Sequence, residues 1–376
     1  MSRDTDVAIV GGGCAGLSLA MRLAGADLRV TVVEPRAHYE EDRTWSFWRT
    51  AADPFVDCVR ASWDRWAVSA DGERVVRGSP VLRYQTLSAR AVYDRALGRC
   101  HDAANVELRS ATAVEGDPKP AGDDLAVATA AGELRAGVVV DTRPPAGPPG
   151  FGQYFVGHEV AVDGAAFDDR TVELMAFGEP RTDRIDFLYV LPFARDRALV
   201  EATSFAPAPP LRAALQAQLD DAVTACTDGR PVECVRREAG FIPMRAGDAR
   251  RAATTGEPRW LRAGVAGGAA RPSTGYAFQR IQRQSDLLAA ALRARGAAPP
   301  APPALDGPVT RGMDALFLKV LRRWPEAGPH LFRQLFAHAP ADRLERFLSG
   351  STASQDRLAV VGALPPTPFL RALLST

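Results

Sequence analysis

The chain has 376 residues, of which 46% are hydrophobic and 24% are charged, and this composition is typical of a folded protein large enough for two domains. Because 46 Lys and Arg residues nearly balance 45 Asp and Glu residues, the net charge of +1 excludes a global electric field that would recruit nucleic acid or anionic lipid. The five cysteines include no C-x-x-C pair and the five histidines lack metal-ligand spacing, so we predict no disulfide framework and no metal site.

The first predicted unit is a strand, a glycine-rich turn and a helix. The apolar strand at residues 6–10 runs into the turn, and a helix at residues 17–23 follows. The turn has the pattern G-x-G-x-x-G at Gly11, Gly13 and Gly16. Gly11 allows a tight turn, Gly13 allows close approach of a pyrophosphate, and Gly16 lets the helix pack closely on the strand. The unit therefore predicts a dinucleotide at the start of the helix.

A second apolar strand, residues 28–33, ends in Glu34. At this distance from the glycines a carboxylate accepts hydrogen bonds from the ribose hydroxyls of a bound dinucleotide. Because the carboxylate would repel a phosphate, the pattern disfavours NADP and leaves FAD and NAD as alternatives.

An aromatic block, Arg43 to Trp48 with the sequence RTWSFW, follows the second strand, and we expect it to lie in a loop. One interpretation is a packing cluster that anchors the loop, because Trp and Phe bury much area wherever they occur. The other is a wall formed by Trp45, Phe47 and Trp48 beside a long apolar ligand or a carbocation, whose charge the ring faces stabilise.

The central part of the chain is rich in strand patterns. Strands are predicted at residues 106–108, 125–129, 138–141, 171–177, 186–193 and 198–205. A Pro- and Gly-rich run at residues 143–152 divides them and predicts a crossover between domains. A helix is predicted at residues 211–226. We expect an antiparallel sheet, inserted between the halves of the nucleotide-binding domain and covered on one face by this helix.

Glu201 lies on the last of these strands, among Leu199, Val200, Ala202 and Phe205. In apolar surroundings desolvation disfavours the charged carboxylate and raises its pKa, which makes a general acid available at neutral pH. Strand alternation alone allows the other placement, in which Glu201 faces solvent opposite Val200.

A small-residue loop follows a short strand that begins at Leu261, and it leads into a helical pattern at residues 278–292. The loop contains Gly267, Gly268, Thr274 and Gly275. Small residues permit close approach to a flat cofactor, and backbone N–H groups at a helix start stabilise anionic charge on a reduced isoalloxazine. A plain surface loop is the alternative.

These segments, in this order, resemble the bacterial lycopene β-cyclase family over nearly the whole chain. The matching segments are VGGGCAG, RTWSFW, LPFARDRALVEATSF, the IPMR that ends at Arg245, GGAARPSTGY, and the tail from Met313 through ADRLERFLSG to PPTPFLRAL. Two places depart from the family: residues 313–318 replace a run rich in Phe and Arg, and residues 269–272 read AARP where Leu-Phe-His-Pro is commoner.

The resemblance implies an α/β fold, with a Rossmann-type FAD-binding domain like that of glutathione reductase, an inserted antiparallel-sheet substrate domain and a helical C-terminal region. The implied division is residues 1–80 and 81–150 for two parts of the FAD-binding domain, 151–255 for the substrate domain, 256–300 for the return segment and 301–376 for the helical region.

The implied activity is that of an isomerase that closes the ψ-ends of lycopene into β-ionone rings, giving β-carotene via γ-carotene. FAD must be reduced, with NAD(P)H as reductant, although no net redox change occurs. Glu201 falls where the family's essential acid lies. The expected cofactor-binding residues are Gly11, Gly13, Gly16, Glu34, Arg43, Gly267, Gly268, Thr274 and Gly275.

Lycopene and γ-carotene reside in the bilayer, so the enzyme must contact a membrane. No apolar run reaches the ~18–20 residues that a spanning helix needs. We therefore expect a cytoplasmic chain that docks peripherally on the inner face of the membrane, through C-terminal helices at residues 316–321 and 369–374, unless these belong to the core. Three other functions stay open: an FAD-dependent monooxygenase or desaturase for an apolar isoprenoid, a cyclase for another carotene or a single ring, and a non-enzymatic carrier.

Overall fold

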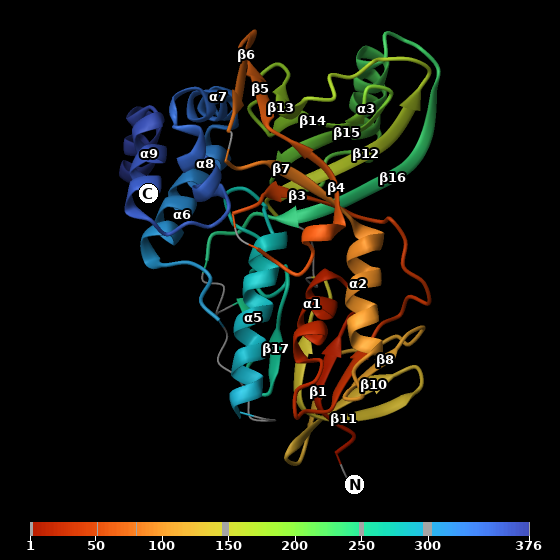
Figure 1. Ribbon diagram of the computed structural model, residues 1–376. Helices are drawn as coiled ribbons and strands as arrows, with labels where there is room; N and C mark the ends of the chain where they lie inside the picture. Colours follow the sequence, from red (N-terminus) through yellow and green to blue (C-terminus); the bar gives the residue numbers. More distant parts are fainter. Residues whose placement is uncertain are drawn as a thin grey trace.

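The computed structural model describes residues 3–50, 52–79, 81–144, 150–247, 252–295 and 303–375. Its lower part contains a nucleotide-binding sheet with three helices, and its upper part contains a second large sheet with the C-terminal helices (Figure 1). Part of the predicted crossover, residues 145–149, lies outside the described residues.

The lower sheet has the strand order β8-β2-β1-β11-β10-β9, with β17 paired to β11. Its strands are β1 (Thr5–Val10), β2 (Val30–Val33), β8 (Val106–Arg109), β9 (Lys119–Ala121), β10 (Asp124–Thr129), β11 (Gly132–Asp141) and β17 (Trp260–Arg262). β1 runs parallel to both β2 and β11. This arrangement is the α/β fold that the sequence predicts.

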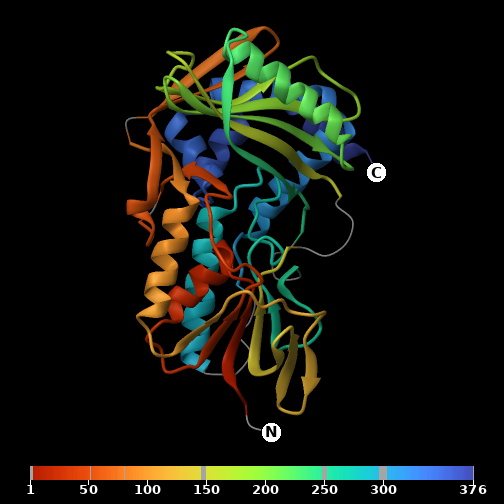
Figure 2. The same ribbon diagram turned by 90° about the vertical axis from the view of Figure 1, so that its right-hand side faces the viewer.

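Three helices cover one face of the lower sheet (Figure 2). They are α1 (Cys14–Leu23), α2 (Ala89–His101) and α5 (Phe278–Arg295). Alternation along β1 divides its side chains between the two faces: Val7 and Ile9 pack with α1 and α5, while Ala8 and Val10 pack with the β9–β10 side. Both faces of β1 are therefore buried, as its continuous apolar sequence requires.

The upper sheet has the order β16-β12-β15-β14-β13-β5-β6. Its strands are β5 (Arg65–Ala70), β6 (Glu73–Gly78), β12 (Gly152–Val162), β13 (Thr171–Phe177), β14 (Ile185–Ala194), β15 (Arg197–Ala206) and β16 (Val232–Pro243). Helix α3 (Arg212–Cys226) covers one face, as predicted. The domain division stays a prediction, to which the structure adds that β5 and β6, from within residues 1–80, join this sheet.

A small third sheet, β3-β7-β4, lies between the other two (Figure 1). It contains β3 (Thr44–Trp48), β4 (Val59–Trp63), which follows the short helix η1 (Val56–Cys58), and β7 (Tyr84–Ser88). The aromatic block is therefore a strand and not the expected loop. The reason is pairing with β7, in which Thr44 lies opposite Ser88 and Trp48 opposite Tyr84.

The C-terminal helices cover the face of the upper sheet opposite α3 (Figure 2). They are α6 (Pro308–Arg323), η2 (Pro325–Ala327), α7 (Gly328–His338), α8 (Ala341–Leu348), α9 (Ser354–Ala363) and α10 (Pro366–Leu374). Arg271, where the sequence departs from the family, anchors them: it is fully buried, it pairs with Asp314 on α6 at 3.2 Å and it donates a hydrogen bond to the carbonyl of Phe347 on α8.

Candidate active site

The turn between β1 and α1 has the geometry that its glycines predict. Gly11 has a φ of +96°, a left-handed conformation that favours glycine. A Cβ on Gly16 would overlap the carbonyl oxygen of Gly11, so glycine is needed for this close packing. Gly13 begins α1 without a side-chain cap, and the nearest atom to an added Cβ would be Arg36 Nη2 at 4.0 Å. This open helix start fits the pyrophosphate of a dinucleotide.

Glu34 follows β2 directly and is 5% exposed. Its Oε2 accepts a hydrogen bond from the backbone N–H of Gly12 at 2.5 Å, and its Oε1 accepts one from Arg36 Nε at 2.6 Å. Glu34 borders the same cavity as Gly13. The carboxylate therefore lies beside the helix start, where the sequence pattern predicts a contact with the ribose.

The loop between β17 and α5 reaches the same cavity. The predicted cofactor-binding residues that border it are Gly11, Gly13, Glu34, Arg43, Gly268, Thr274 and Gly275. Gly16 and Gly267 do not border it and support the two loops from behind: a Cβ on Gly267 would come 2.6 Å from the Cα of Ala263. The structure thus brings the two predicted glycine-rich segments together around one space.

That space is a cavity of about 1650 Å³, which extends from the glycine-rich turn to the upper sheet. Sites for one small ligand have about 300–1,000 Å³, so this cavity has room for a dinucleotide and a second ligand. Its upper part is bordered by aromatic rings from β14, β15 and helices α6, α7 and α10, namely Phe187, Phe205, Phe317, Phe332, Phe336 and Phe369. The second ligand is therefore expected to be apolar.

Glu201 lies on β15 and faces this cavity, because alternation directs Val200 and Ala202 toward α3. Its Oε1 accepts a hydrogen bond from Thr203 Oγ1 at 2.8 Å. Burial raises the pKa of Glu201 well above its usual range, and the charge of Glu238 raises it further. Burial therefore favours the protonated form of this carboxyl group, which faces the cavity.

Three tyrosines border the same cavity: Tyr84 on β7, Tyr189 on β14 and Tyr276 in the loop before α5. The hydroxyl oxygens of Tyr84 and Tyr189 are 2.8 Å apart, and Tyr189 lies opposite Glu201 in the sheet. Burial raises the pKa of all three hydroxyls well above 10, so they stay neutral. These neutral hydroxyls therefore contribute dipoles to the cavity, and none of them is a second acid or an anion beside Glu201.

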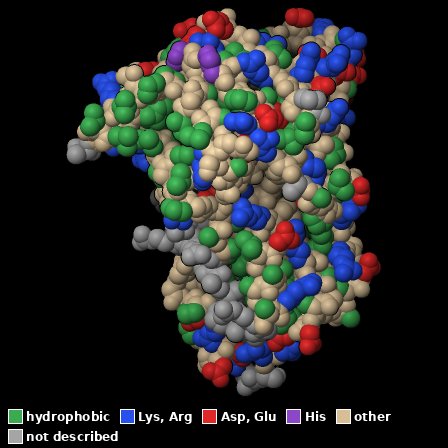
Figure 3. All heavy atoms as spheres, turned by 60° about the vertical axis from the view of Figure 1, so that its left-hand side comes forward, with side chains coloured by type: hydrophobic (Ala, Val, Ile, Leu, Met, Phe, Trp, Pro, Cys, Tyr) green, Lys and Arg blue, Asp and Glu red, His purple; other side chains and the backbone are tan. Residues whose placement is uncertain are grey.

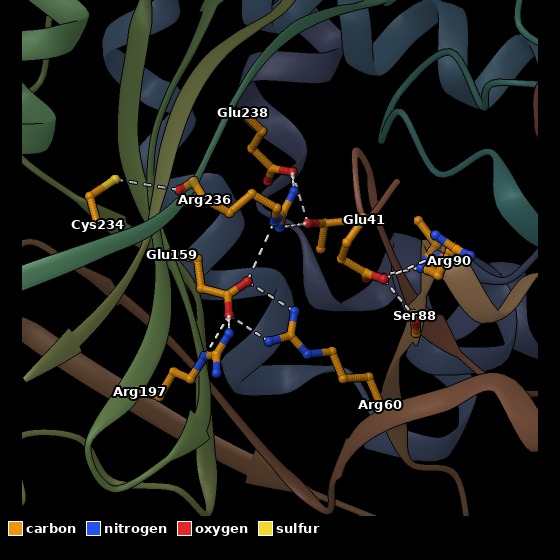
Figure 4. Close-up of polar contacts among 11 residues, drawn as sticks. Glu41, Arg60, Ser88, Arg90, Glu159, Arg197, Cys234, Arg236 and Glu238 are labelled. Atoms are coloured by element: carbon orange, nitrogen blue, oxygen red, sulfur yellow. Dashed lines mark hydrogen bonds and ion pairs between the residues drawn. The ribbon is translucent and has the colours of Figure 1, made fainter. Parts of the chain in front are cut away.

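A second carboxylate, Glu238 on β16, also borders the cavity, and only 5% of its side chain is exposed. Its Oε2 accepts hydrogen bonds from Arg236 Nη1 at 2.7 Å and from Thr44 Oγ1 at 2.9 Å (Figure 4). Two donors therefore fix the position of this oxygen.

Arg236 is held in turn by Glu159, which is 1% exposed and lies in a cluster of arginines (Figure 4). Burial opposes ionisation of Glu159, but hydrogen bonds from Arg60 at 2.5 Å and from Arg197 at 2.6 Å lower its pKa to about 2. This permanent anion fixes the guanidinium that contacts Glu238.

The aromatic block contributes one ring to the cavity, that of Trp45. The structure differs from the predicted wall at the other two positions. Phe47 stacks on Phe278 with ring centroids 5.0 Å apart, and Trp48, 1% exposed, packs edge-on against Trp66 at 5.4 Å. The physical reason is burial of β3 on both faces, so Phe47 and Trp48 act as core residues.

The sequence reasoning missed Glu238 and the three tyrosines. Glu238 could have been found, because it is an acid just before the apolar segment that includes IPMR. The tyrosines had no such signal, since Tyr84, Tyr189 and Tyr276 come from three separate segments that only the fold brings together.

Within the described residues, no three His, Cys, Asp or Glu side chains lie together as metal ligands would. Among the helices that the structure describes, none combines the length and the apolar character needed to cross a membrane.

Comparisons with known proteins agree with this architecture. The model of the family described as lycopene cyclase protein matches residues 6–374. A lycopene beta-cyclase from Paracoccus sp. is 28% identical, over 98% of this chain and 96% of that protein. A geranylgeranyl bacteriochlorophyll reductase-like protein from Thermoplasma acidophilum has a TM-score of 0.64 at 12% identity, with 98% of each chain covered. A halogenase variant solved with FAD has a TM-score of 0.59 at 12% identity, covering 96% of this chain and 86% of that one. These likenesses confirm the predicted fold class.

Proposed function

This chain belongs to the lycopene cyclase family, and we propose that it is a lycopene β-cyclase, an isomerase that converts lycopene to β-carotene via γ-carotene. The observation that carries the proposal is the placement of Glu201. A carboxyl group with a raised pKa faces an aromatic cavity that continues into a dinucleotide cradle. Acid-catalysed ring closure of a hydrocarbon needs these two features, a proton donor and a dry space.

In the proposed reaction Glu201 protonates C2 of the acyclic end group, which leaves a tertiary cation at C1. The C5=C6 double bond attacks this cation, and loss of the C6 proton completes the β-ring. The surrounding residues keep water away from the cation: Phe187 and Phe205 line the sheet side of the cavity, and Phe332 closes it from α7. The faces of these rings and of Trp45 stabilise the positive charge.

We propose FAD, in its reduced form, as the cofactor. The cradle fits it, because Gly13 leaves the start of α1 open for the pyrophosphate, Glu34 lies in reach of the ribose, and Gly268 and Gly275 border the cavity where the ring system would lie. When bound, reduced FAD would supply negative charge close to the cation. NAD(P)H is the proposed reductant, and it is needed only to prime the flavin.

A membrane is the proposed source of lycopene, and the C-terminal helices offer a docking surface. Val361 on α9 and Leu370 and Leu373 on α10 are 57%, 57% and 66% exposed, and all three also border the cavity. Figure 3 shows hydrophobic side chains gathered on this part of the surface. The cavity therefore opens through an apolar rim, which suits the boundary between headgroups and acyl chains.

The docking surface is tested by sedimentation with phospholipid vesicles. A double variant, Leu370→Ser with Leu373→Ser, is expected to lose most of the vesicle-bound fraction, and Leu211→Ser serves as the control because Leu211 is 80% exposed at the start of α3, away from the rim. If the double variant and the control bind vesicles equally well, the C-terminal helices are not the docking surface.

The proposed activity is tested by expressing the chain in lycopene-accumulating bacteria and separating the pigments. We expect β-carotene from the wild type and unchanged lycopene from Glu201→Gln. Glu233→Gln, an exposed glutamate on β16, is the matched control, and FAD content verifies that each variant is folded. Unchanged lycopene from the wild type would refute the proposal, and consumption of oxygen and NAD(P)H in proportion to product would indicate a monooxygenase instead.

A further inference from the structure

The upper sheet places four residues in one row across four strands. Tyr189 on β14 lies opposite Glu201 on β15, Glu201 lies opposite Gly157 on β12, and Gly157 lies opposite Glu238 on β16. Directly paired residues share one face of a sheet. The two carboxylates therefore flank a residue that has no side chain, on the face toward the cavity.

Gly157 leaves the space that lets the two glutamates meet. A Cβ on Gly157 would lie 3.4 Å from the Cβ of Glu201 and 3.3 Å from the Cγ of Glu238. The negative charge of Glu238 contributes to the raised pKa of Glu201. Because two ionised carboxylates on neighbouring strands repel each other, this arrangement favours one proton on the pair.

The two oxygens of Glu238 have different surroundings. Oε2 is held by Arg236 and Thr44, whereas Oε1 is buried and has no hydrogen-bond partner among the described residues. An unpartnered buried carboxylate oxygen is costly. A proton on Glu201, across the space that Gly157 leaves, would satisfy it, which couples the orientation of Glu238 to the protonation of Glu201.

We propose that Glu201 and Glu238 form a dyad that shares one proton, in which Glu238 is the positioning residue that holds this proton on Glu201. The inference rests on the proposed cyclase function. In the first step the O–H bond of Glu201 breaks and the C2–H bond forms. In the last step the C6–H bond breaks, its electron pair forms the C5=C6 double bond, and the proton returns to the dyad. No oxidant or reductant is consumed.

Between these steps both carboxylates are ionised and face the cation from one side. Within the described residues, the groups that interact with the dyad are the neutral hydroxyls of Thr44, Thr203, Tyr84 and Tyr189 and the guanidinium of Arg236, and Tyr276 joins them through Tyr84. Arg236 offsets one of the two negative charges, so a net negative charge remains to stabilise the cation.

The test is the pH profile of kcat for purified, FAD-loaded enzyme acting on lycopene in vesicles. Glu238→Gln keeps the shape and the acceptor for Arg236 but removes the charge. Loss of a neighbouring negative charge lowers the pKa of Glu201, so we expect the alkaline limb of the profile to move down by about one pH unit or more. At a pH on the alkaline limb the rate should fall about tenfold or more, while KM stays nearly constant.

A second readout does not depend on turnover. The infrared band of a protonated carboxyl group in the wild type is expected to disappear in Glu201→Gln and to titrate at lower pH in Glu238→Gln. Gly157→Ala places a methyl group between the carboxylates, and we expect it to move the alkaline limb of the kcat profile to lower pH as well. This variant carries the test if Glu238→Gln does not fold. Glu233→Gln is the control for loss of a carboxylate elsewhere on β16.

The outcomes separate the two proposals. If the wild type produces no ring from lycopene, the proposed function fails, and the infrared titration still decides whether the proton is shared. If the wild type is active but Glu238→Gln or Gly157→Ala keeps the wild-type pH profile and infrared titration, the dyad is overturned and the cyclase proposal stands.

Discussion

Glu345 on α8 is expected to make the fold sensitive to alkaline pH. It is 1% exposed, and burial raises its pKa from 4.5 to about 8. Between these two values the folded chain holds a proton that the unfolded chain releases. The stability associated with this carboxyl group is therefore full below about pH 4.5 and decreases as the pH rises to about 8.

The change from 4.5 to about 8 corresponds to about 5 kcal/mol between the protonated and ionised limits. Local relaxation and water entry reduce the penalty of a buried charge, so we expect about 2–3 kcal/mol in practice. Glu345→Gln removes the titration and keeps the shape. For a chain of 376 residues this gain corresponds to an increase in Tm of about 3 °C at pH 9 and almost none at pH 4.5.

The assay is thermal unfolding of the wild type and Glu345→Gln, followed by circular dichroism at several pH values between 4.5 and 9. Glu326→Gln, an exposed glutamate in η2, is the matched control and should show no pH-dependent gain. A difference in Tm between the wild type and Glu345→Gln that stays constant with pH would refute the reasoning, because it would show that Glu345 titrates as an ordinary carboxyl group.

Three further outcomes follow from packing. Gly16→Ala should lower the amount of FAD bound per chain, measured by absorbance, because the new Cβ would overlap the carbonyl of Gly11. A normal flavin content would contradict the proposal that this turn binds FAD. Trp48→Ala should lower the free energy of unfolding in urea by about 3–5 kcal/mol, whereas a surface aromatic would change it little. Asp314→Ala should cost about 3–5 kcal/mol because it leaves Arg271 buried and unpaired, and an unchanged urea midpoint would show that other contacts hold this charge.

The sequence allowed prediction of features that depend on local pattern. Gly11 and Gly13 could be assigned because a strand, a tight turn and a helix start require them within a few residues. The strand that carries Glu201 could be assigned from its apolar neighbours, but its cavity-facing side could not, since that depends on α3 covering the opposite face.

The remaining features depend on distant partners. Trp45 and Trp48 are three residues apart with the same side chain, yet only Trp45 reaches the cavity, because Trp66 and Tyr84 enclose Trp48. Arg271 looked like a simple departure from the family, and its contacts with Asp314 on α6 and Phe347 on α8 explain why a fully buried guanidinium is tolerated there.

The pairing of β5 with β13 has a consequence for biosynthesis. Arg65 lies beside Thr171, 106 residues later in the chain, and β6 joins the sheet only through β5. At a translation rate of about 5–20 residues per second, β5 is synthesised about 5–20 s before its partner strand β13. During that interval Trp66 and Val68, which are fully covered in the finished fold, have no sheet to pack on. We therefore expect the nascent chain to bind chaperones at this stage, and shortening the delay by circular permutation should increase the yield of folded protein.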